Sequence, residues 1–170
     1  MVKKLIPALL LLITLPVQAC KIDIGFTPSD SALANVINVI NSASSSLDVE
    51  AYSFTSRDIA GALLKAKERG VTVRVVADEK ANTGKYSAVT WLVNNGVNVR
   101  LNGQYAIMHN KVIIADNKHI ETGSFNFTSS AIKRNAENNL IIYNCPDVAI
   151  VYSKEFNRLW NESAEQSPNY

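Results

Sequence analysis

Two periodicities alternate along the first half of the chain. Short runs at 22–26, 47–54 and 71–77 alternate apolar with polar residues or are rich in Val, and they predict β-strands. Between these runs, apolar residues recur at the spacing of one helix face. The two sets are Leu33, Val36, Ile37 and Ile40, and then Ile59, Leu63 and Ala66. Ser29 and Ser56 are predicted to cap these helices, and Gly70 ends the second. A strand–helix–strand run with short loops implies parallel pairing.

The second half of the chain continues the alternation and adds a hairpin. A helix is predicted from about Tyr86 to Asn94, and Gly96 ends it. Strands are predicted at 97–101, 107–115, 119–124 and 138–143, with a turn at Asp116-Asn117-Lys118. A short helix follows Asn126, and a last helix spans about 147–162. The predicted fold is an α/β sandwich: a mixed, largely parallel β-sheet flanked by helices on both faces.

The first 19 residues form a separate segment. Lys3 and Lys4 precede an apolar run, Leu5 to Val17, and Val17-Gln18-Ala19 is a small-residue cleavage pattern. The run has about 13 residues, fewer than the ~20 that span a bilayer. Residues 1–19 are therefore predicted to be a signal peptide that directs the protein to the periplasm or the medium. Residues 20–170 have the length of a single domain.

Cys20 and Cys145 are the two cysteines of the chain. A cysteine directly after a cleavage site is what a lipoprotein signal presents, so lipidation of Cys20, with attachment to a membrane, is one alternative. The other is a Cys20–Cys145 disulfide in an oxidising compartment.

The charge balance excludes a globally basic nucleic-acid binder. The chain has 17 basic and 15 acidic residues, and residues 1–19 contain two of the lysines and no acid, so the mature chain has a net charge of zero. Binding to phosphate must then come from a local arrangement. Four residues could follow a nucleic-acid backbone or could belong to an ordinary solvated surface: Lys80, Lys85, Lys133 and Arg134.

Residues 109–126 gather side chains suited to a phosphodiester. His109 and Lys111 are two residues apart on a predicted strand and therefore share a face. A two-residue loop at Asn117-Lys118 would place Lys111 opposite Ser124, His109 opposite Asn126 and Asp116 opposite His119. Lys provides a charge for phosphate oxygens, Ser and Asn provide neutral donors, and His attacks phosphorus or moves protons. Gly123 lets the backbone approach closely. The sequence shows no acidic cluster with metal-ligand spacing, so we expect neither a metal nor another cofactor.

These residues spell H-x-K-x4-D-x6-G-S-x-N, with every fixed position present: His109, Lys111, Asp116, Gly123, Ser124 and Asn126. The pattern resembles the HKD motif of the phospholipase D superfamily. The resemblance extends over about 150 residues to small bacterial periplasmic endonucleases of that superfamily, through the stretches AYSFT, KERGV, DEKANTGK and ETGSFNFT. It implies a phospholipase D-like fold for residues 20–170 and a metal-independent endonuclease that cleaves DNA, or both DNA and RNA, with little sequence preference.

The resemblance also implies roles for individual residues. Superfamily members use two HKD motifs at one site, where one histidine forms a covalent phosphohistidine and the other protonates the leaving oxygen. This chain carries one motif, which implies a homodimer that shares the site. Lys111 and Asn126 from both subunits would bind the phosphate, with Ser124 in support. Glu137 would accept a hydrogen bond from Nδ1 of His109 and orient it. Asp116 falls on the other face, so we expect a capping or pairing role.

Two other functions use the same residues. Phospholipid head groups are also phosphodiesters, so a phospholipase D is one alternative. A non-catalytic nucleic-acid-binding module is the other, although a binding module needs no nucleophile. His119 is predicted to be a surface hairpin residue, and Trp91 and Trp160 to be packing residues. Phe125 and Phe127 flank Asn126 and either pack in the core or contact substrate.

Overall fold

The computed structural model describes residues 19–84 and 87–168. The elements, in chain order, are β1 (Lys21–Phe26), α1 (Ser31–Ser42), β2 (Ser46–Ala51), α2 (Arg57–Glu68), β3 (Thr72–Asp78), α3 (Glu79–Asn82), α4 (Ala88–Asn94), β4 (Asn98–Asn102), β5 (Lys111–Ala115), β6 (His119–Gly123), α5 (Ser129–Lys133), β7 (Asn138–Tyr143), α6 (Pro146–Glu162) and β8 (Ala164–Glu165). The predicted signal peptide, residues 1–18 of which are not described, stays a prediction.

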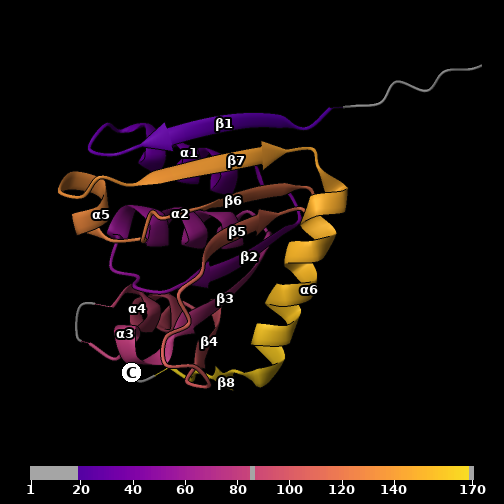
Figure 1. The fold of residues 1–170 in the computed structure, drawn as a ribbon. Helices are drawn as coiled ribbons and strands as arrows, with labels where there is room; N and C mark the ends of the chain where they lie inside the picture. The colour runs from indigo at the N-terminus through magenta and orange to yellow at the C-terminus, as the bar shows by residue number, and fades with distance from the viewer. Residues whose placement is uncertain (1–18, 85–86, 169–170) are drawn as a thin grey trace, which may run out of the picture.

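The strands form one mixed sheet in the order β1-β7-β6-β5-β2-β3-β4-β8 (Figure 1). The α/β sandwich is confirmed, but the expected predominance of parallel strands is wrong. In the described chain only β2–β3 and β3–β4 pair in parallel, and the other five pairings are antiparallel. After β4 the chain returns across the sheet and inserts β5 beside β2 in the opposite direction, and no local hydrophobic pattern encodes that return.

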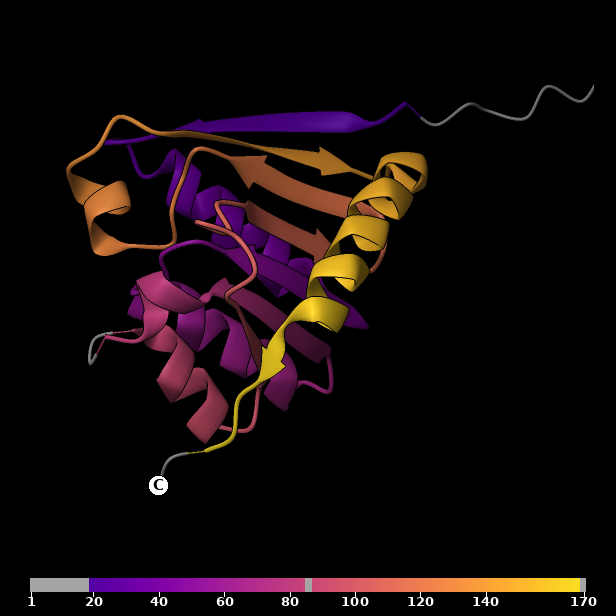
Figure 2. The ribbon, with the colours of Figure 1, turned by 60° about the horizontal axis from the view of Figure 1, so that its bottom comes forward.

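Helices cover both faces of the sheet (Figures 1 and 2). On one face α1, α2 and α4 pack on the larger core, whose fully buried side chains include Val36, Leu63 and Leu92. On the other face α6 lies across β6, β5, β2, β3 and β4 and buries Phe156 and Leu159. This arrangement follows from the sequence, because each helix carries one apolar stripe and the central strands are apolar on both sides.

Of the two predicted helix caps, one is confirmed and one is wrong. The hydroxyl of Ser56 caps α2 by accepting a hydrogen bond from the Ile59 amide. Ser87 caps α4 in the same way. The cap expected at Ser29 is wrong, because the N-cap of α1 is Asp30, which makes no side-chain capping bond. Ser29 instead donates to the Phe26 carbonyl.

The β5–β6 hairpin is present, but its predicted register is wrong by one residue. Ala115 lies opposite His119 and Val112 opposite Thr122, so the turn has three residues rather than two. The reason is that Asp116 and Asn117 both adopt positive φ, 53° and 52°, a conformation that Asp and Asn tolerate. The expected opposition of Lys111 to Ser124 is therefore not formed within β6.

Cys20 and Cys145 form a disulfide with their Cα atoms 5.3 Å apart. Of the two alternatives for Cys20, the structure has the disulfide, which joins the residue before β1 to the start of α6. Among the described residues, no helix is long and apolar enough to cross a membrane.

Candidate phosphodiesterase site

The site is built around the start of β5. His109 lies just before the strand and is exposed, whereas Lys111 begins the strand and is only 5% exposed. The Lys111 ammonium donates a 2.6 Å hydrogen bond to the His109 carbonyl. It also lies 5.3 Å from the ring centroid of Tyr52, whose ring is 4.5 Å from the His109 imidazole. The hydrogen bond to the His109 carbonyl and the contact with Tyr52 thus hold the Lys111 ammonium near the exposed His109.

Burial alters the acidity of this cation. Burial lowers the pKa of the Lys111 ammonium, and the negative charge of Glu137 opposes part of the decrease. A partly dehydrated ammonium interacts more strongly with a phosphate than a fully hydrated one does, because less water screens the charge. The position and the partial burial of Lys111 therefore suit it to binding an anion.

Ser124 and Glu137 are hydrogen-bonded to each other at the edge of the site. The Ser124 hydroxyl donates to Glu137 at 2.6 Å and accepts from the Asn138 amide at 3.1 Å. The second oxygen of Glu137 accepts from Asn135 at 2.8 Å. In the described chain, then, Glu137 contacts Ser124 and Asn135 rather than His109, and its orienting role stays a prediction.

Gly123 and Asn126 show why the motif needs these residue types. A Cβ on Gly123 would lie about 2.3 Å from the Asn138 carbonyl oxygen, so only glycine allows β6 to approach β7 this closely. The side-chain oxygen of Asn126 is buried and has no hydrogen-bond partner among the described residues. A buried side-chain oxygen without a partner calls for an explanation, and a ligand that donates a hydrogen bond to it is one.

Asp116 has a structural role, as expected from its position on the other face. Its carboxylate accepts hydrogen bonds from the backbone amides of Ser44, Ser45 and Ser46, and from two of their hydroxyls. Burial alone would raise the pKa of Asp116, but these bonds outweigh it and hold the pKa below its ordinary value. The motif aspartate therefore fastens the hairpin to the loop before β2.

Other predicted residues lie outside the motif cluster. Phe125 and Phe127 are fully buried, which confirms packing and excludes direct substrate contact. His119 is a hairpin residue whose Nδ1 accepts from the Asn144 amide. Lys80, Lys133 and Arg134 are exposed, and Lys85 lies outside the described residues. Contact between these cations and nucleic acid stays a prediction.

Sequence reasoning missed four residues beside the site. A cavity of about 230 Å³ contains His109 and Lys111 in its lining, together with Glu50, Asn110 and Tyr152. Glu50 is 1% exposed and accepts a 2.8 Å bond from Asn110, the residue between His109 and Lys111. Tyr52 contacts both His109 and Lys111. The available signal was Glu50 itself, a carboxylate within a predicted strand.

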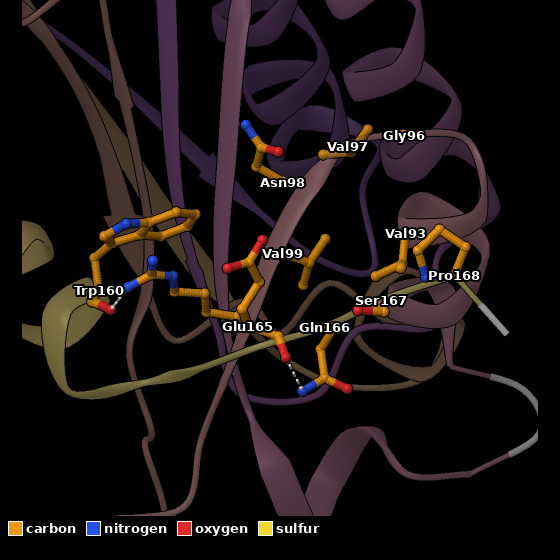
Figure 3. A pocket seen from close by; sticks show the side chains of 11 residues that line it. Val93, Gly96, Val97, Asn98, Val99, Trp160, Glu165, Gln166, Ser167 and Pro168 are labelled. Carbon is orange, nitrogen blue, oxygen red and sulfur yellow. Dashed lines mark hydrogen bonds between the residues drawn. The ribbon is translucent and has the colours of Figure 1, made fainter.

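A second cavity of about 410 Å³ lies at the far end of the sheet, between β4, the end of α6 and residues 165–168 (Figure 3). No motif residue lines it. In the part of the chain that is described, no three His, Cys, Asp or Glu side chains are grouped as a metal site requires.

Comparison with known proteins identifies the family. The family described as "Cardiolipin synthase, PLD-like domain" matches residues 36–160, a span that includes the whole motif and Glu137. The chain belongs to the phospholipase D superfamily. The crystal structure of Nuc from Salmonella typhimurium, a phospholipase D family member, superposes with a TM-score of 0.86 and 41% identity, covering 87% of this chain and 99% of that one.

Two curated relatives of this chain have names that refer to lipid substrates. Phospholipase D of Rickettsia conorii is 40% identical over 122 residues, 72% of this chain and 61% of that protein. Mouse mitochondrial cardiolipin hydrolase is 34% identical over 134 residues, 79% of this chain and 60% of that protein. The chain therefore spans about three fifths of the length of these relatives.

Proposed function

We propose that the protein is an exported phosphodiesterase that cleaves nucleic acid without a metal, as a non-specific endonuclease. The observation that carries the proposal is that exposed His109 and the buried residue Lys111 both contact the Tyr52 ring, within the complete motif. An imidazole next to a fixed cation can attack phosphorus while the cation neutralises charge on the phosphoryl oxygens.

The reaction has two steps. A nitrogen of His109 attacks phosphorus and forms a P–N bond, and the bond to the leaving oxygen breaks. The imidazolium of His109 from a second subunit gives its proton to that oxygen. The now neutral imidazole then takes a proton from water, whose oxygen attacks phosphorus and breaks the P–N bond. Lys111 and Asn126 hold the non-bridging oxygens with Ser124 in support, and Glu137 orients a His109 imidazole.

Nucleic acid is the favoured substrate because the sequence resembles the small endonucleases of the superfamily over about 150 residues. The Cys20–Cys145 disulfide supports export, because disulfides persist in oxidising compartments. A phospholipase D is the second candidate, and the names of the Rickettsia and mouse relatives favour it. A non-catalytic binding module is the third, and the complete motif disfavours it.

The test is plasmid nicking in excess EDTA. Wild-type protein should relax supercoiled plasmid, and His109→Ala should reduce the rate at least about 10³-fold, because it removes the nucleophile. The chain has two histidines, so His119→Ala is a matched control that should retain activity. Equal nicking by His109→Ala would contradict the mechanism. Turnover of phosphatidylcholine vesicles without nicking would replace nucleic acid with lipid as the substrate.

A further inference from the structure

The described residues also form a cavity that is larger than the one at the motif. It has a volume of about 740 Å³ and forms where the starts of α2, α4 and α5 meet. Its lining includes Thr55, Arg57, Ala60, Ala88, Trp91 and Ser129. The two alanines leave room for an occupant, and the other side chains offer a cation, an indole and hydroxyls.

Two backbone segments connect this cavity to the candidate active site. The amides of Thr55 and Ser56 both donate 2.9 Å hydrogen bonds to the Phe127 carbonyl. Phe127 follows Asn126 directly, and Ser129 at the cavity lies three residues beyond Asn126, at most about 11 Å along an extended chain. Tyr52, which packs on His109, is three residues before Thr55. The cavity is therefore within reach of the nucleotides that flank a phosphate held at the motif.

Trp91 differs from Trp160, the other tryptophan of the chain. The face of Trp160 is covered by the Arg100 guanidinium at 4.5 Å and by a stacked Phe156 ring at 5.8 Å. Trp91 is 41% exposed, and no ring or cation of the described residues lies against it. An indole with an uncovered face can stack on a planar ligand.

Arg57 supplies the charge. It is exposed at the first residue of α2 and makes no ion pair with the described part of the chain. The described lining of the cavity contains no Asp or Glu, so the cavity suits an anion rather than the cationic amine of a lipid head group. A nucleotide combines an anion with a planar ring and therefore suits both features of the cavity.

We propose that this cavity is a subsite for one unpaired nucleotide beside the scissile phosphodiester, with its base stacked on Trp91 and its phosphate bound by Arg57. The proposal rests on the proposed nuclease function and narrows its substrate. A base can stack on an indole only when it has left its own stack, so the subsite favours single-stranded nucleic acid or duplex ends.

Steady-state kinetics on two substrates test the subsite. Trp91→Ala should raise KM for a single-stranded 12-mer about 5- to 150-fold, the range that corresponds to the loss of one base stack, and should change kcat little. Arg57→Gln should raise the same KM and make it less dependent on salt. Both variants should hydrolyse bis(p-nitrophenyl) phosphate normally, because that substrate does not extend beyond the motif. Trp91→Phe should restore part of the loss.

Lys65→Ala and Trp160→Phe are the matched controls. Lys65 is an exposed cation on the same helix, two turns from Arg57 and outside the cavity, and Trp160 lies at the far cavity of Figure 3. Both should leave KM unchanged. Unchanged KM in Trp91→Ala and Arg57→Gln, with wild-type cleavage of the 12-mer intact, would overturn the subsite alone. Wild-type hydrolysis of bis(p-nitrophenyl) phosphate without cleavage of any nucleic acid would instead overturn the proposed function.

Fluorescence provides a readout without turnover. Trp160→Phe combined with His109→Ala leaves Trp91 as the single tryptophan of an inactive protein. The 12-mer should quench its emission, and the same sequence as a blunt duplex should quench it less. Quenching by phosphatidylcholine vesicles but not by the oligonucleotide would overturn the proposal in favour of a lipid.

Discussion

At the residue scale, Glu50 is a buried carboxyl directly behind the motif. It accepts one hydrogen bond, from Asn110, and its second oxygen is buried with no partner among the described residues. Burial raises the pKa of Glu50 to about 7, although the bond from Asn110 opposes the increase. The Glu50 carboxyl is thus mostly protonated below about pH 7 and mostly ionised above it.

The pH dependence of stability tests this interpretation. Unfolded Glu50 loses its proton near pH 4.5 and the folded residue near pH 7. Between these values the folded state binds more protons, so stability falls as pH rises. At about 1.4 kcal/mol per pKa unit, the ionised carboxylate costs about 3 kcal/mol. Glu50→Gln should therefore be about 3 kcal/mol more stable relative to wild type at pH 8 than at pH 4, by urea unfolding.

The control for Glu50 is Glu68→Gln, an exposed carboxyl at the end of α2. Its stability difference from wild type should stay constant over the same pH range. Glu121 belongs to the same class as Glu50, because it is fully buried and burial raises its pKa to about 8. A pH-independent difference between Glu50→Gln and wild type would contradict the account of Glu50.

At the scale of elements, Asp116 holds the β5–β6 hairpin to the loop between α1 and β2. Those two segments are about 70 residues apart in the sequence. The sequence placed Asp116 in the right turn and on the right face. The sequence did not reveal the hydrogen-bond partners of Asp116. The amides of Ser44, Ser45 and Ser46 reach its carboxylate only because the end of α1 and the start of β2 lie beside the hairpin.

Asp116→Asn should lower the free energy of unfolding by about 2–4 kcal/mol at pH 7, because an amide replaces a charged acceptor of several hydrogen bonds. Asn tolerates the positive φ of this position, so backbone strain does not contribute. The low pKa of Asp116 means that this stabilisation is present above about pH 4 and is lost as pH falls further. The wild-type advantage should therefore shrink in acid. Urea unfolding of Asp116→Asn beside Asp58→Asn, an exposed control, measures both effects.

At the scale of the whole molecule, each chain carries one HKD motif, whereas the proposed two-step mechanism uses two His109 side chains. The described chain offers His109 on an open surface, where a second copy could meet it. A dimer with one site on its two-fold axis satisfies the requirement, because the axis brings the same residue from both subunits together.

Mixed dimers test the shared site. A heterodimer of wild-type and His109→Ala subunits, purified through different tags, has one histidine at its single site. It should retain less than about a tenth of wild-type activity, because either the attack or the proton transfer lacks its group. Retention of roughly half the activity would indicate two independent sites. Sedimentation of active wild-type protein as a single subunit would also contradict the dimer.

The sequence by itself determined most of the helices and strands, the α/β class and the complete motif, because these depend on local periodicity and on residue type. It did not indicate α3 or β8, and it began the strand of the motif at residue 107, whereas β5 begins at Lys111. Tertiary structure decided the antiparallel majority of the sheet, the three-residue turn of the hairpin, the disulfide and the cavity between Arg57 and Trp91. Each of these depends on segments far apart in the chain, such as Thr55 with Phe127 or Asp116 with Ser45, whose contacts form only when the sheet assembles.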